Sequence, residues 1–220
     1  MLIKLKKITF LVMFAFAWIT VSVTIGFADT INVGNEIRLF DGPGTTNGGE
    51  FQLFMGGEKQ FNTFCLETTE FFTYGEPLTV VGITDTAYNG SVGPTGDLLN
   101  YETAYLYTMF RNGSLTRLND TPYSSNPDNS ANALQAAIWY FEGERPKPAE
   151  GTLADRWVDE AIAAGWSNIG NVRVLNLINA RGGRAQDQLV LVPEPSTLLI
   201  LGAGLLGLGI FGRKRFKRKS

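Results

Sequence analysis

The chain has 220 residues, of which 44% are hydrophobic, with one cysteine and no histidine. The lack of histidine excludes Ser-His-Asp and Cys-His catalysis, and it removes the ligand on which most zinc and iron sites depend. The formal net charge is −2, but residues 29–192 hold 20 of the 21 acidic residues and only 10 of the 19 basic ones. This acidic part is a poor binder of nucleic acid, which requires clustered Lys and Arg.

Residues 1–28 have the three parts of a secretory signal peptide. A basic start is followed by an apolar stretch from Ile8 to Ile25 and by a small-x-small cleavage site that ends at Ala28. An uncleaved N-terminal membrane helix is the alternative interpretation. We expect removal of the signal, which leaves residues 29–192 as one domain outside the cytoplasm.

The N-terminal half of this domain has the alternating apolar pattern of β-structure. Turns are expected at 41–44 and 55–58. The glycine-rich segment 41–49 is expected to be a surface loop that binds no phosphate, because it lacks a Gly-Lys-Ser/Thr sequence. The expected strands cover residues 30–33, 37–40, 48–54, 60–66 and 78–81.

The C-terminal half has apolar residues at helical spacing. We expect helices over 101–110, over 129–141 with Asn129 or Ser130 as the N-cap, and over 153–164 with Gly165 at its end. In the third helix, the acidic residues, Asp155 among them, should point mostly outward. The residues expected to face the core are Leu153, Trp157, Ala161 and Ile162. Two further strands are expected over 172–177 and 188–192.

Together these elements predict an α+β fold. Its N-terminal part is β-rich and barrel-like or sandwich-like, and about three helices pack on it. The signal peptide precedes this domain, and a membrane helix is expected to follow it.

The C-terminal segment 193–220 has three parts of its own. Pro193-Glu194-Pro195 precedes an apolar run from Thr197 to Gly212, and a cluster of Lys and Arg ends the chain. The run is at the short end for a membrane helix, and the basic cluster should stay in the cytoplasm. This tail resembles the PEP-CTERM sorting signal of Gram-negative bacteria. The resemblance implies an inner-membrane intermediate, processing by an exosortase, and release to the cell surface or extracellular matrix. A plain tail anchor is the alternative.

The single cysteine has a candidate reaction partner in Gln135. Cys65 lies on an expected strand, where it shares a face with Thr63 and Glu67, and Gln135 lies in the first half of an expected helix. Trp139 follows Gln135 by one helical turn, so the indole can cover the glutamine side chain. A thiolate held beside a carboxamide can displace ammonia and close an internal thioester without a separate base. An amine that opens the thioester forms a permanent amide and frees the thiol.

Two motifs also carry a family resemblance. Phe64-Cys65-Leu66-Glu67 and Leu134-Gln135-Ala136-Ala137-Ile138-Trp139 resemble motifs of the thioester domains of bacterial surface adhesins, over roughly residues 30–190. The resemblance implies a cross-link between Cys65 and Gln135, with Phe64, Leu66 and Trp139 shielding it from water. This chain differs from those adhesins in its context. They are mostly cell-wall-anchored proteins with long stalks, whereas here a sorting tail follows the domain directly.

Alternatives for Cys65 are a buried structural thiol and an intermolecular disulfide.

The leading functional hypothesis is a secreted surface or matrix protein that attaches covalently to amine or hydroxyl nucleophiles of an extracellular polysaccharide or protein. A second is a non-reactive structural or carbohydrate-binding protein of the exopolysaccharide matrix or biofilm, with sugars bound by aromatics such as Tyr74, Tyr88 and Tyr123. A third is a hydrolase that uses Glu67 and Glu70. We expect no enzymatic activity and no cofactor. Carboxylates and carbonyls could still form a calcium site, but no calcium loop of the Asp-x-Asp-x-Asp-Gly type occurs, and we expect no metal.

Overall fold

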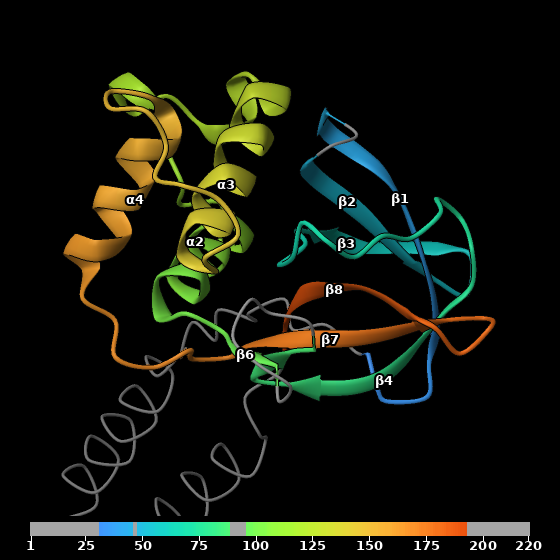
Figure 1. Ribbon diagram of the computed structural model, residues 1–220. Helices are drawn as coiled ribbons and strands as arrows, with labels where there is room; N and C mark the ends of the chain where they lie inside the picture. Colours follow the sequence, from blue (N-terminus) through green and yellow to red (C-terminus); the bar gives the residue numbers. More distant parts are fainter. Residues whose placement is uncertain (1–30, 46–47, 89–95, 193–220) are drawn as a thin grey trace, which may run out of the picture.

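The computed structural model describes residues 31–45, 48–88 and 96–192 (Figure 1). Its main feature is a six-stranded sheet of order β3-β2-β1-β4-β7-β8, in which every neighbouring pair is antiparallel. A two-stranded sheet, β5-β6, lies beside it. The strands are β1 (Glu36–Thr45), β2 (Gly48–Met55), β3 (Glu58–Thr63), β4 (Leu78–Thr84), β5 (Thr86–Ala87), β6 (Asp97–Leu98), β7 (Val172–Asn179) and β8 (Arg184–Leu191).

Three α-helices of the described chain gather on one side of the sheet (Figure 1). They are α2 (Tyr101–Arg111), α3 (Pro127–Phe141) and α4 (Leu153–Ala164), and two short 3-10 turns, η1 (Leu118–Asp120) and η2 (Tyr123–Ser125), connect α2 to α3. The α+β class and the number of helices agree with the sequence prediction. Helix α3 lies against β1 and β2, and this places its inner face next to the sheet.

The sheet is not a closed barrel, so that part of the prediction was wrong. Strands β3 and β8 are its two edges; among the described residues they form no ladder with each other and meet at the end of β3 and in the segment that follows it. There, Cys65 forms an isolated bridge with Gln188, Leu66 N donates to Asp187 O at 3.4 Å, and Leu189 N donates to Phe64 O at 3.1 Å. A barrel needs its edge strands to pair along their length. Here the chain leaves the sheet after this short contact and runs without regular structure as far as β4.

Glycines account for a second difference in the sheet. The expected turn at 41–44 lies inside β1, where the register with β2 shifts between Asp41 and Gly44. A Cβ on Gly42 would lie 2.6 Å from the carbonyl oxygen of Glu50, so only glycine lets the two strands approach this closely. The described residues of 30–33 form no strand, because the chain turns at Val33 and Gly34 before it enters β1.

The helix boundaries follow the capping side chains. The Thr152 hydroxyl accepts from Asp155 N at 3.2 Å, and Gly165 ends α4 in the left-handed conformation with φ of 61°, so the predicted helix 153–164 is confirmed. Helix α3 begins earlier than predicted. Its N-cap is Asn126, whose side chain accepts from Asn129 N at 3.4 Å, and Pro127 occupies the first turn.

The buried face of α4 also differs from the prediction at two positions. Ile162 is 53% exposed, whereas Val158 is buried beside Trp157. Asp155 is buried instead of pointing outward, because its carboxylate accepts from Gly151 N at 3.0 Å and forms an ion pair with Lys147 at 3.0 Å. The backbone N–H of Gly151, in the turn before the helix, and the Lys147 ammonium thus hold this acidic residue in place.

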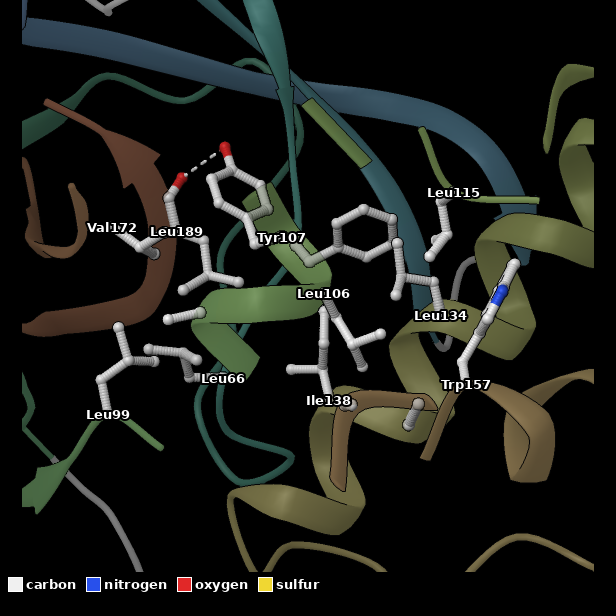
Figure 2. Packing of buried hydrophobic residues seen from close by; sticks show 14 of the residues in the cluster. Leu66, Leu99, Leu106, Tyr107, Leu115, Leu134, Ile138, Trp157, Val172 and Leu189 are labelled. Atoms are coloured by element: carbon white, nitrogen blue, oxygen red, sulfur yellow. Dashed lines mark hydrogen bonds between the residues drawn. The ribbon is translucent and has the colours of Figure 1, made fainter. Parts of the chain in front are cut away.

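The interior is divided into two hydrophobic clusters, and the segment after β3 passes between them. Phe64 and Leu66 belong to the cluster under the helices, which includes Leu106, Leu134 and Trp157 (Figure 2). Cys65 belongs to the cluster on the sheet, against which Trp139 packs. Alternation along this short extended stretch therefore sends Cys65 to one side and its two neighbours to the other.

The predictions for both chain ends lie outside the described residues: the signal peptide 1–28, the sorting motif Pro193-Glu194-Pro195 and the expected membrane helix within 193–220. Within 31–45, 48–88 and 96–192, no helix is long and apolar enough to cross a membrane.

One buried carboxylate gives the fold a dependence on pH. Glu142 follows α3 and accepts from Asn100 N at 3.3 Å, and burial raises its pKa to about 7. A raised pKa means that its contribution to stability is complete below about pH 4.5 and is lost as pH rises through about 7. We expect the free energy of unfolding to fall over this range by about 3 kcal/mol more in the wild type than in Glu142→Gln. Urea unfolding of both proteins at pH 5 and pH 8 measures this difference, and parallel pH profiles would contradict it.

Candidate functional site

Cys65 lies where the segment after β3 meets β8. Thr63 Oγ1 donates to Leu189 O at 2.7 Å, and the bridge from Cys65 to Gln188 follows two residues later. The cysteine is 1% exposed and is a free thiol. Strand β8 thus holds the backbone around Cys65, and burial restricts the movement of the sulfur.

Gln135 reaches this cysteine from α3 and contacts it twice. Its Nε2 donates to Cys65 O at 2.9 Å, and Cys65 Sγ donates to its Oε1 at 3.4 Å. Gln135 is also 1% exposed, and its neighbours Leu134 and Ile138 are buried in the cluster under the helices. The structure therefore brings the two sequence-predicted residues together and orients the carboxamide against the thiol.

Trp139 and Gly48 enclose the glutamine side chain. Trp139 follows Gln135 by one turn of α3, on the same face. A Cβ on Gly48 would lie 2.7 Å from Trp139 Cη2 and 3.1 Å from Gln135 Cγ, so the start of β2 lies directly against both side chains. After α3 the chain turns back, because Glu144 N donates to Trp139 O at 2.8 Å, and the guanidinium of Arg145 lies 5.7 Å from the indole centroid.

The cysteine lies at the wall of a pocket of about 470 Å³. Aromatic side chains form much of this wall, and two of them face solvent, Phe71 at 76% and Tyr74 at 40% exposed. Phe72 makes an edge-to-face contact with Phe51, which fixes this aromatic group on β2. The full lining is Gly48, Phe51, Cys65, Thr68, Phe71, Phe72, Tyr74, Trp139, Arg145 and Gln186.

The surroundings keep the Cys65 thiol protonated. Burial raises its pKa most, and the nearby Glu67 carboxylate raises it further, whereas Trp139 lowers it as a hydrogen-bond donor. Neutral thiol is a weaker nucleophile than thiolate. In this site the sulfur therefore has to lose its proton during the reaction itself.

The three expected shielding residues lie in different places. Phe64 and Leu66 are fully buried under the helices, and neither lines the pocket. Trp139 lines the pocket together with Cys65. Of these three side chains, Trp139 is therefore the one that is placed to limit the access of water from the pocket.

A group of buried carboxylates lies near the cysteine. Glu67, Glu70 and Asp187 each place one oxygen within 4.8 Å of the others. Such oxygens are ligands for a hard cation. Both oxygens of Asp187, however, already accept hydrogen bonds, from Tyr88 N and Asn176 Nδ2 at 2.8 Å and from Leu177 N at 3.1 Å. These hydrogen bonds give the buried Asp187 carboxylate a structural role, because they hold β7, β8 and the end of β5 together.

Two of the three tyrosines considered for sugar binding lie away from this pocket. Tyr88 lies under the Arg184 guanidinium, and Tyr123 stacks on Trp157 while its hydroxyl donates to Glu50 Oε1 at 2.8 Å. Tyr74 lines the pocket, and its hydroxyl donates to Asp41 at 3.1 Å.

Sequence reasoning missed the residues that the fold adds to the site from a distance. Gly48 stands where the glycine-rich segment 41–49 overlaps the expected strand 48–54, and Phe71 and Phe72 come from a stretch without regular structure. Glu144 accepts from Thr68 N at 2.9 Å and from Thr68 Oγ1 at 2.7 Å, tying that stretch to the end of α3. The adjacent aromatics Phe71 and Phe72 were the one visible signal, since exposed aromatic pairs often mark a binding surface.

The comparisons with known proteins identify the tail. The PEP-CTERM protein-sorting motif matches residues 191–215, so the match begins at the last residue of β8. This motif implies processing by an exosortase and export through the membrane to the cell surface. The comparisons with curated proteins and with solved structures found no match.

Proposed function

We propose that this chain is an exported surface or matrix protein that attaches covalently to its partner through an internal thioester between Cys65 and Gln135. The observation that carries the proposal is the double contact between these two buried residues, with the sulfur 3.4 Å from the carboxamide oxygen. A lone cysteine has no disulfide partner within the chain, and burial separates it from other chains.

Thioester formation needs no group that the chain lacks. Cys65 Sγ bonds to Gln135 Cδ, the bond from Cδ to Nε2 breaks, and the nitrogen leaves as ammonia with the thiol proton. Holding the sulfur and the carboxamide in contact makes this step intramolecular, which favours it over a reaction between free groups. The enclosing indole and the buried surroundings slow hydrolysis of the product.

The partner would supply an amine or hydroxyl nucleophile, from an extracellular polysaccharide or protein. It attacks the acyl carbon of residue 135, and the carbon–sulfur bond breaks. The products are an amide or ester to the partner and a free Cys65 thiol. The sorting motif supports an extracellular setting, and we place the protein on the surface or in the matrix of a Gram-negative bacterium.

Intact mass spectrometry of the full chain, purified from the envelope of the expressing cells, tests the proposal. After its ends are assigned by peptide mapping, we expect a deficit of about 17 Da for lost ammonia, and methylamine should add about 31 Da. Digestion before methylamine treatment should give one peptide pair joined between residues 65 and 135.

Cys65→Ala is the matched control, because it removes the sulfur with a small change in volume. This variant should show neither the deficit nor the methylamine adduct. A wild-type chain of unshifted mass with a freely titratable thiol would contradict the thioester and would favour the non-reactive matrix protein.

A further inference from the structure

The Trp139 indole N–H is a buried donor that forms no hydrogen bond of normal geometry among the described residues, but it is close enough to the Cys65 sulfur to lower the pKa of that thiol. Leaving such a donor unpaired is costly, and native structures pair nearly all of them. The same chain shows the usual arrangement at Trp157, whose Nε1 donates to Thr116 O at 2.8 Å. The Cys65 sulfur is therefore the acceptor that this N–H is placed to meet.

The position of the indole is fixed on three sides. The six-membered ring of the indole lies against Gly48, and the Arg145 guanidinium lies over the indole. Gln135 lies one helical turn before Trp139. It packs against the sheet cluster that contains Cys65, and both side chains line the same pocket. The N–H is thus held next to the reacting pair.

We propose that the Trp139 N–H donates a hydrogen bond to the Cys65 sulfur when this sulfur leaves as a thiolate, which makes Trp139 a catalytic residue of thioester opening. This inference rests on the proposed function. It assigns to Trp139 a role in the chemistry in addition to shielding.

Opening of the thioester forms one bond and breaks another. The nucleophile bonds to the acyl carbon of residue 135, whose carbonyl electrons move onto the oxygen. When they return, the carbon–sulfur bond breaks and sulfur takes the electron pair. The Trp139 N–H donates to this sulfur while the charge exists. The proton released by the attacking amine then converts the thiolate to the Cys65 thiol.

Such a donor is needed because the site destabilises a negative charge on the sulfur. Burial and the Glu67 carboxylate both raise the pKa of the thiol, and Trp139 acts in the opposite direction. A thiolate with a high pKa is a poor leaving group. A donor that is already in place stabilises the charge without reorganisation, and removal of one donor to an oxyanion lowers a rate by about 10²–10³.

Trp139→Phe, compared with Trp166→Phe in the full chain, tests the inference. Trp166 is half-buried beyond the end of α4 and contacts Tyr105, remote from the pocket. We expect Trp139→Phe to slow methylamine addition by about 10–100-fold, since sulfur is a weaker acceptor than oxygen. Trp166→Phe should react at the wild-type rate.

The pH dependence of the opened form separates this chemical role from a structural one. Alkylation of the Cys65 thiol after methylamine treatment, followed against pH, should show a thiol pKa that is higher in Trp139→Phe than in the wild type. Benzothienylalanine at position 139 keeps a bicyclic ring without the N–H, so it gives the same readout if the phenylalanine variant folds poorly. An unchanged thiol pKa with an unchanged opening rate would overturn the role of Trp139. Absence of the 17 Da deficit in the wild type would instead overturn the thioester itself.

Discussion

Gly48→Ala is expected to destabilise the domain by about 2–5 kcal/mol and to abolish the alignment of Cys65 with Gln135. The figure combines overpacking with the strain of a positive φ. Gly48 has φ of +154°, and a Cβ there would lie 2.7 Å and 3.0 Å from two carbons of the Trp139 ring. The ring cannot yield like a flexible side chain, because it is rigid and packs against the sheet cluster.

Gly56→Ala is the control for this substitution. Gly56 also has a positive φ, +61°, but a Cβ there has no neighbour within 4 Å, so only backbone strain is added. We expect it to cost about 1–2 kcal/mol and to leave the methylamine adduct intact. Urea unfolding and intact mass of the two variants measure both effects. Equal losses of stability in the two would show that Gly48 does not hold Trp139 in place.

Trp157→Ala is expected to cost about 3–5 kcal/mol of stability, through a cavity in the cluster under the helices. Its side chain projects from α4 and is fully buried in this cluster (Figure 2). It stacks on Tyr123 at a centroid distance of 5.8 Å. The indole also donates to Thr116 O, which would be left without this donor.

Two further variants show how much of the stability lost in Trp157→Ala comes from packing and how much from the hydrogen bond. Trp157→Phe keeps most of the packing and loses the hydrogen bond, so we expect about 1–3 kcal/mol. Trp166→Ala removes a half-buried indole and should cost less than Trp157→Ala. Chemical unfolding of all three variants checks the order, and a mild Trp157→Ala would mean that the helices do not depend on this residue.

Local signals predicted the elements whose ends are set by neighbouring residues. Thr152 and Gly165 mark the two ends of α4, and both lie next to the periodic stretch. Asn126 was harder to identify as a cap, because the polar loop before α3 offers several asparagines and serines. The barrel prediction failed because closure depends on where β3 and β8 separate, and alternation along one strand contains no information about its partner.

The pairing of Cys65 with Gln135 could be predicted because each residue stands in a recognisable motif. The rest of the site comes from contacts between distant parts of the chain. Gly48, Arg145 and Phe71 meet the pair only after β2, the end of α3 and the irregular stretch after β3 have packed together. The protonation state of the thiol was likewise out of reach, because it depends on burial and on the nearby Glu67.

The contact between the sheet and α3 has a consequence for chain entropy. Cys65 and Gln135 are 70 positions apart, so a covalent bond between them would close a large loop in the unfolded chain. By the chain-entropy relation for cross-links, such a loop contributes about 4 kcal/mol to stability. A nucleophile that opens the bond removes this contribution. The form that has captured its partner would therefore be the less heat-resistant and more protease-sensitive one, so that attachment itself would limit how long the captured domain stays folded.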